Sequence, residues 1–142
     1  MNDMILPHCF DNELGLLNAC FCPGGLERVI EIVEPDDFYS EAGKQIFEKM
    51  VAFNRASTEP TPYQMDKAFQ DTKDYLMIRN VLDELRPITA EVATHYAKII
   101  KELSERRKAI KQAYTLYLDL HDPTFPIPST ESRLAMAGVV NG

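Results

Sequence analysis

The feature that most constrains this chain is a periodic run in its last third. Apolar or permissive residues alternate in steps of four and three from Val92, at Tyr96, Ile99, Leu103, Arg106, Ile110, Ala113, Tyr117 and Leu120. This spacing predicts one helix of about four heptads. From Thr89 to Leu120 such a helix would be roughly 45 Å long, at about 1.5 Å per residue. A small bundle cannot cover that length, so we expect the far end of the helix to pack against another partner.

The far end of this helix is predicted to carry an exposed apolar seam, with Arg106 as its polar interruption. Tyr114, Tyr117 and Leu118 have two interpretations, as the core of a helical hairpin or as an interface between subunits, and the two merge if hairpins dimerise. The sequence 121–128 is expected to turn, and Ser129 or Thr130 to cap a short returning helix over 134–139. The predicted interface residues are Ile110, Ala113, Tyr114, Tyr117 and Leu118.

Helix breakers divide the first 90 residues into about five short helices, and no strand pattern is convincing. Asp11 is expected to cap the first helix, whose apolar face is Phe10, Leu14, Leu17 and Phe21. The sequence Cys22-Pro23-Gly24-Gly25 should end it. Four further helices are predicted: one with Leu26, Val29, Ile30 and Val33, one capped by Ser40, one started by Thr61, Pro62 and Gln64, and one with Tyr75, Ile78, Leu82 and Leu85.

The predicted fold class is therefore all-α. A compact helical head of about five helices spans residues 1–90, and a long helix with a partial helical hairpin spans 91–142. A chain of 142 residues needs only one core, so we expect the two parts to form one structural unit.

Charge is unevenly distributed between these parts. Residues 1–90 carry 16 Asp and Glu against 8 Lys and Arg, a net of −8, and residues 91–142 carry 6 against 7, a net of +1. DNA binding draws its affinity from clustered cations, so an acidic head is a poor DNA-gripping surface. We expect protein partners and little or no direct DNA binding.

A basic run on the predicted long helix is the second candidate site. The interpretations are a solvated face with Glu and Lys pairs, docking onto an acidic partner or a neighbouring head, and, least favoured, contact with DNA. The candidate docking residues are Lys101, Arg106, Arg107, Lys108 and Lys111.

Catalytic and cofactor motifs are not found. No Gly-x-x-x-x-Gly-Lys-Ser/Thr loop occurs, His8, His95 and His121 are far apart, and Asp36-Asp37 reads as a solvated loop. We predict no enzyme activity, no metal and no cofactor. The three cysteines read as free thiols of a cytoplasmic protein, and no apolar run reaches the length of a membrane span.

Four phrases of the sequence resemble one known domain. They are Leu6 to Ala19, Pro35 to Phe47, Ala93 to Ile100 with its Tyr96, and Arg106-Arg107 followed by Ile110. In this order and spacing they are similar to the N-terminal domain of DnaB-type replicative DNA helicases.

The resemblance implies a non-motor domain that acts in DNA replication. In that family the domains form a collar, a trimer of dimers paired through helical hairpins, which holds the helicase ring. The same surface recruits the C-terminal domain of primase, and helicase loaders compete there. These implications predict a homo-oligomer within a primosome.

Several residues depart from the family pattern. Gly43 stands where the family usually has His, Asn18 replaces a Gly, and the segment after Gln64 is short, which suggests a phage or mobile-element branch. The returning helix has only about ten residues, so either the chain was cut from a longer protein or its dimer surface is curtailed. The alternative function is a free-standing regulator or inhibitor that binds a helicase through the same fold.

Overall fold

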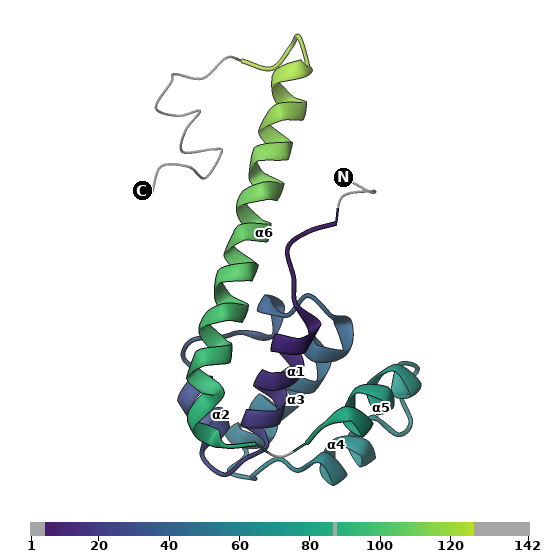
Figure 1. Cartoon of the computed structure of the whole chain (residues 1–142). Coiled ribbons are helices and arrows are strands. Elements are labelled where there is room, and N and C mark those ends of the chain that lie inside the picture. Colours follow the sequence, from purple (N-terminus) through teal and green to yellow (C-terminus); the bar gives the residue numbers. More distant parts are fainter. Residues whose placement is uncertain (1–4, 87, 127–142) are drawn as a thin grey trace. The chain divides into compact units, whose positions relative to one another are not determined.

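The computed structural model describes residues 5–86 and 88–126, and every regular element in this part is helical (Figure 1). The all-α prediction is confirmed, with five α-helices before the long one. The elements are α1 (Phe10–Cys20), α2 (Gly25–Val29), η1 (Pro35–Asp37), α3 (Glu41–Arg55), α4 (Pro62–Phe69), α5 (Tyr75–Glu84), η2 (Ala90–Val92) and α6 (Ala93–His121).

The chain divides into two compact units. The first is His8–Glu102, which holds α1 to α5 and the beginning of α6; the described residues of the second are 5–7 and 103–126. The core of the first unit is formed by side chains of every α-helix in it. Its fully buried members include Leu16, Leu26, Phe47, Met65, Ile78 and Ile100.

Two helix starts follow directly from local sequence. The Ser40 hydroxyl accepts a hydrogen bond from the Gly43 N–H at 3.0 Å and caps α3. Thr61 and Gln64 form a reciprocal capping box at the start of α4, with bonds of 3.2 and 3.0 Å. Both predicted caps are confirmed, because each needs only residues three apart.

The beginning of α1 differs from the prediction. Cys9 occupies the N-cap position without a side-chain cap bond, and Asp11 lies in the first turn, where its charge favours the helix dipole. Phe10 is 55% exposed, whereas Leu16 and Leu17 are buried. The apolar face was misplaced because Glu13 and Gly15, which do not read as core residues, are also buried.

The interpretation of Asp36-Asp37 as a solvated loop is wrong for Asp37. Asp36 is exposed, but Asp37 is only 1% exposed and accepts a hydrogen bond from the Glu34 N–H at 2.8 Å. This bond closes a capping box around η1, and Asp37 therefore belongs to the structure of the turn and not to a solvated loop.

The long helix is confirmed as a single element. α6 contains 29 residues and continues past Arg106 without a break. Asp122 then begins a turn, in which its carboxylate accepts bonds from the N–H and hydroxyl of Thr124. The predicted returning helix over 134–139 and its caps at Ser129 or Thr130 lie outside the described residues.

The buried stripe of α6 is displaced by one residue from the predicted seam. Tyr96, Ile99 and Leu103 are half-buried and Arg106 is exposed. The buried positions are Ala93, Ala97, Ile100, Ser104, Arg107 and Leu116. Ala93, Ala97 and Ser104 are small and let helices approach closely. The periodic pattern of large apolar residues therefore did not include them.

Candidate functional site

The five predicted interface residues lie together on α6, in the unit that contains residues 103–126. Tyr117 is 57% exposed and Leu118 50% exposed, and Ala113 is also exposed. Ile110 and Tyr114 are half-buried. The structure thus places two large apolar side chains of the predicted set in contact with solvent.

Aromatic rings stack along the same stretch of α6. The rings of Tyr114 and Tyr117 are stacked with centroids 6.2 Å apart, and Tyr117 meets His121 edge-on at 4.5 Å. These contacts join residues three and four apart, which share a helix face. Tyr117 thus contacts aromatic rings on both sides along the helix and is still 57% exposed.

Two leucines near this stretch were not part of the predicted interface set. Leu120 is exposed and extends the apolar surface of Tyr117 and Leu118, although it was absent from the predicted interface set. Leu116 is buried, although the heptad seam left it out. We call Tyr117, Leu118 and Leu120 the α6 apolar surface.

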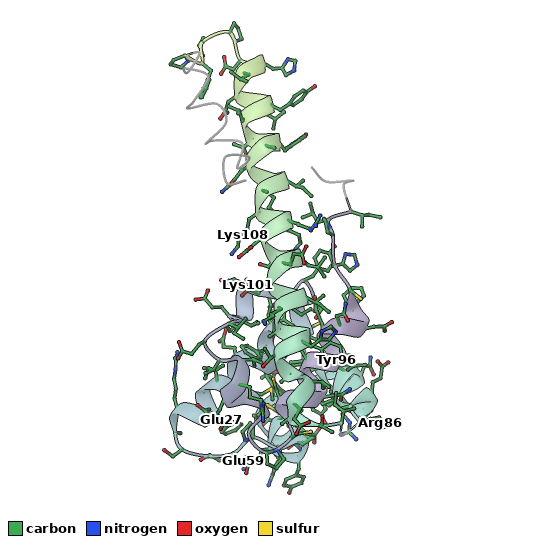
Figure 2. The ribbon with its side chains drawn as sticks, turned by 60° about the vertical axis from the view of Figure 1, so that its left-hand side comes forward. Glu27, Glu59, Arg86, Tyr96, Lys101 and Lys108 are labelled. Atoms are coloured by element: carbon green, nitrogen blue, oxygen red, sulfur yellow. The ribbon has the colours of Figure 1, made fainter. Side chains whose placement is uncertain are left out.

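The five predicted docking residues do not form one patch. Arg106, Lys108 and Lys111 are exposed on α6, but Arg107 is buried and its Nη1 donates to the Pro7 carbonyl oxygen at 2.9 Å. Lys101 lies nearer the beginning of α6 than Lys108 (Figure 2). Arg107 and Lys101 both have structural partners within the chain.

The partner of Lys101 is the buried carboxylate of Asp37. The Lys101 Nζ lies 3.3 Å from Asp37 Oδ2 and 3.5 Å from Oδ1. Because Asp37 also holds η1, this ion pair connects the first half of α6 to the turn before α3. The Lys101 side chain is one-third exposed, so water still reaches its ammonium group.

Glu13 is a structural residue that sequence reasoning missed. Its side chain is buried, and its two carboxylate oxygens accept bonds from the Tyr39 N–H, the Ser40 N–H and the Ser40 hydroxyl. The bonds are 2.8, 3.2 and 2.8 Å long. Glu13 thereby ties α1 to the start of α3, and a lone Glu in a helix gives no local sign of this role.

Chemistry at the Cys20 thiol is disfavoured. Cys20 is buried, and burial raises the pKa of its thiol to about 12, with the charges of Cys22 and Glu27 adding to the shift. It therefore remains a neutral thiol at physiological pH.

Within residues 5–86 and 88–126, no set of three His, Cys, Asp or Glu side chains could hold a metal ion. No helix in these residues has the length and apolarity to cross a bilayer.

The helical head and the beginning of the long helix match one family. The sequence model described as "DnaB-like helicase N terminal domain" matches residues 5–102. The chain belongs to this family. The DnaB N-terminal domain is the non-catalytic part of the helicase, so the chain corresponds to a domain without the motor.

Two known proteins are similar to this DnaB-type domain. The replicative DNA helicase DnaC of Bacillus subtilis is 29% identical over 125 residues, which cover 84% of this chain and 27% of that protein. The chain thus spans about a quarter of that relative's length. The crystal structure of the N-terminal domain of DnaB helicase from Mycobacterium tuberculosis has the same fold, with a TM-score of 0.70, 15% identity, and coverage of 94% of this chain and 96% of that one.

Gly43, at the start of α3, is closely packed by neighbouring side chains. A Cβ atom at Gly43 would lie 2.6 Å from Ser40 Oγ and 2.7 Å from Phe38 Cδ2. The packing around α3 has closed onto the glycine, so a His would not fit there without a shift of its neighbours. The bonds between Glu13 and Ser40 stabilise the start of α3 at the same place.

Proposed function

We propose that this DnaB-type domain assembles the non-motor collar of a replicative helicase and docks primase or a loader, in the cytoplasm. The observation that supports this most directly is the α6 apolar surface, with Tyr117 and Leu118 half or more exposed. A soluble protein rarely leaves such side chains clustered unless another surface covers them.

The proposal follows from how a ring gains stability. A contact between two α6 helices buries a modest apolar area, and a modest area gives a weak dimer. Motors joined to these domains would hold the partners at a high effective concentration, so weak contacts become sufficient. A dimer of these domains, repeated three times around a ring, would form the collar.

The dimer is tested by light scattering of the wild type beside Tyr117→Asp, each over a range of concentrations. The wild type should show a dimer that forms with increasing concentration, and Tyr117→Asp should remain monomeric because it places a charge on the apolar surface. Thr115→Asp is the matched control, since it adds the same charge to an exposed position of α6. A monomeric wild type, or a dimeric Tyr117→Asp, would contradict the proposal.

Partner docking is tested by calorimetry with the C-terminal domain of a primase. We expect binding to this domain, and weaker binding to Arg106→Glu/Lys108→Glu, which reverses two exposed charges of α6. Lys98→Glu, at an exposed position on α6 outside this pair, is the control. Equal affinity for all three proteins would remove the basic surface from the docking proposal.

A further inference from the structure

A groove at the side of the head is a second surface, independent of α6. It has a volume of about 330 Å³ and lies where α1, the start of α3 and α5 meet. Figure 1 shows α1 and α3 adjacent in the head, and both helices contribute to the groove. Its apolar floor includes Phe10, Leu14, Met77 and Val81, and its acidic rim includes Asp11, Glu41 and Glu84. We call it the acidic groove.

The floor of the acidic groove is open to solvent. Phe10 is 55% exposed and Met77 is 37% exposed. Methionine adapts its shape to different partners and is frequent on surfaces that receive helices. Phe10 also lies against His8 and Tyr39, whose rings are 4.7 and 5.9 Å from it, so aromatic surface continues beyond the groove.

The rim determines which partner fits. Asp11, Glu41 and Glu84 are exposed, and none of the described residues that line the groove is a Lys or Arg. The field at the rim is therefore negative. Lys and Arg side chains can lay their apolar stems along a floor of this kind and place their charges beside rim carboxylates.

We propose that the acidic groove binds a basic amphipathic helix of another protein. The partner would insert apolar side chains spaced three and four residues apart between α1 and α5, and its flanking Lys or Arg would meet the three carboxylates. The volume is near the lower end of the roughly 300–1,000 Å³ typical of ligand pockets, which suits a few side chains.

The proposed subunit contact of a second copy fits the groove less well. Its exposed apolar side chains on α6 are Tyr117, Leu118 and Leu120, and the sequence from 112 to 126 contains Asp119 and Asp122 but no Lys or Arg. Placing that stretch against three carboxylates would bring like charges together. The stretch of α6 proposed as the subunit contact is thus not complementary to the acidic groove. The preceding turns of α6 carry Arg106, Lys108 and Lys111, and a peptide of residues 104–121 tests them as an occupant.

Methionine methyl NMR of the whole chain tests this binding. Met77 reports on the groove, while Met50 and Met65 are fully buried and serve as references for the fold. The probe is a synthetic helical peptide of leucines at helical spacing flanked by lysines; the matched peptide has glutamates in place of the lysines. Met77→Leu assigns the signal. We expect the Met77 methyl to shift and saturate with the lysine peptide only.

Charge variants then locate the site. Asp11→Asn/Glu84→Gln should weaken binding of the lysine peptide by roughly threefold to tenfold, the range expected for losing two exposed ion pairs. Glu59→Gln/Asp71→Asn neutralises two exposed carboxylates that do not line the groove and should bind like the wild type. Unchanged Met50 and Met65 signals confirm that each variant is folded.

Three results would overturn the proposal. One is a Met77 signal that does not move with the lysine peptide. Another is equal weakening by the two double variants, which would indicate general attraction to an acidic protein. The third is equally tight binding of a peptide copied from residues 104–121 of this chain, which would assign the groove to a second copy.

Discussion

The Glu13 carboxylate accepts a hydrogen bond from the Tyr39 backbone N–H at 2.8 Å, across 26 positions of sequence. Two further bonds from Ser40 complete the set, so one side chain of α1 satisfies three donors at the start of α3. Because Glu13 is buried, no water can replace these bonds cheaply.

Glu13→Ala should therefore destabilise the fold. We expect the free energy of unfolding to fall by about 3 kcal/mol, since buried donors lose a charged acceptor. Glu13→Gln should lower the free energy of unfolding by less, because the amide oxygen still accepts a hydrogen bond. Some loss should remain, because the amide nitrogen would face a donor. Urea denaturation followed by circular dichroism measures both. Glu48→Ala, at an exposed position of α3, should change stability by less than about 0.5 kcal/mol.

Local sequence predicted the elements but not these contacts between them. The caps at Ser40 and Thr61 were predicted because their partners are three residues away. Glu13 and Asp37 could not be recognised, because their partners lie 26 and 64 positions along the chain. Their roles depend on which helices meet, and that depends on the whole fold.

In the candidate site, too, the helix was predicted and its contacts were not. Periodicity predicted the extent of α6 and an exposed apolar region around Tyr117. It misplaced the buried stripe by one residue, since Ala93, Ala97 and Ser104 carry little apolar signal. It also grouped Lys101 and Arg107 with the exposed basic residues, because charge alone does not reveal the partners Asp37 and Pro7.

The Lys101 side chain is predicted to act in stability more than in docking. Lys101→Met removes the ammonium group that pairs with the buried Asp37 carboxylate, and losing one partner of a buried pair costs several kcal/mol. Lys101 is one-third exposed and water offsets part of this loss, so we expect about 2 kcal/mol from thermal or urea denaturation. Lys98→Met, at an exposed position on the same helix, should be nearly neutral; a similar cost for both would refute the role of the ion pair.

The Asp66 carboxyl is predicted to titrate differently without its tyrosine partner. A hydrogen bond from the Tyr75 hydroxyl, 2.7 Å away, lowers the pKa of Asp66 below 3.8, and Arg79 at 2.9 Å lowers it further. A lowered pKa stabilises the fold above the ordinary value, and this contribution is lost as pH falls through the folded pKa.

Tyr75→Phe should accordingly move the pKa of Asp66 upward, toward 3.8, and reduce the acid-dependent loss of stability that Asp66 causes. Carboxyl carbon NMR titration measures the pKa directly. Tyr63→Phe removes the hydroxyl of an exposed tyrosine on α4 and should leave Asp66 unchanged. An unchanged Asp66 in Tyr75→Phe would show that Arg79 alone is sufficient.

The contact between α1 and α6 at Gly15 provides the last prediction. A Cβ atom at Gly15 would lie 2.6 Å from Tyr96 Cζ and 2.7 Å from Cε1, so the ring of Tyr96 packs directly on the glycine. Alanine is favoured over glycine in a helix by about 1 kcal/mol, but overpacking costs about 1–3 kcal/mol. We expect the steric cost to exceed the helix propensity, and Gly15→Ala to destabilise the domain.

A double-mutant cycle separates the two effects. In a Tyr96→Leu background the ring is gone, so Gly15→Ala should become neutral or stabilise by up to about 1 kcal/mol through helix propensity. The measurement is the free energy of unfolding of all four proteins by urea denaturation. If Gly15→Ala costs the same in both backgrounds, the steric contact with Tyr96 is not its cause. A change of sign would show that this glycine allows the long helix to pack against α1.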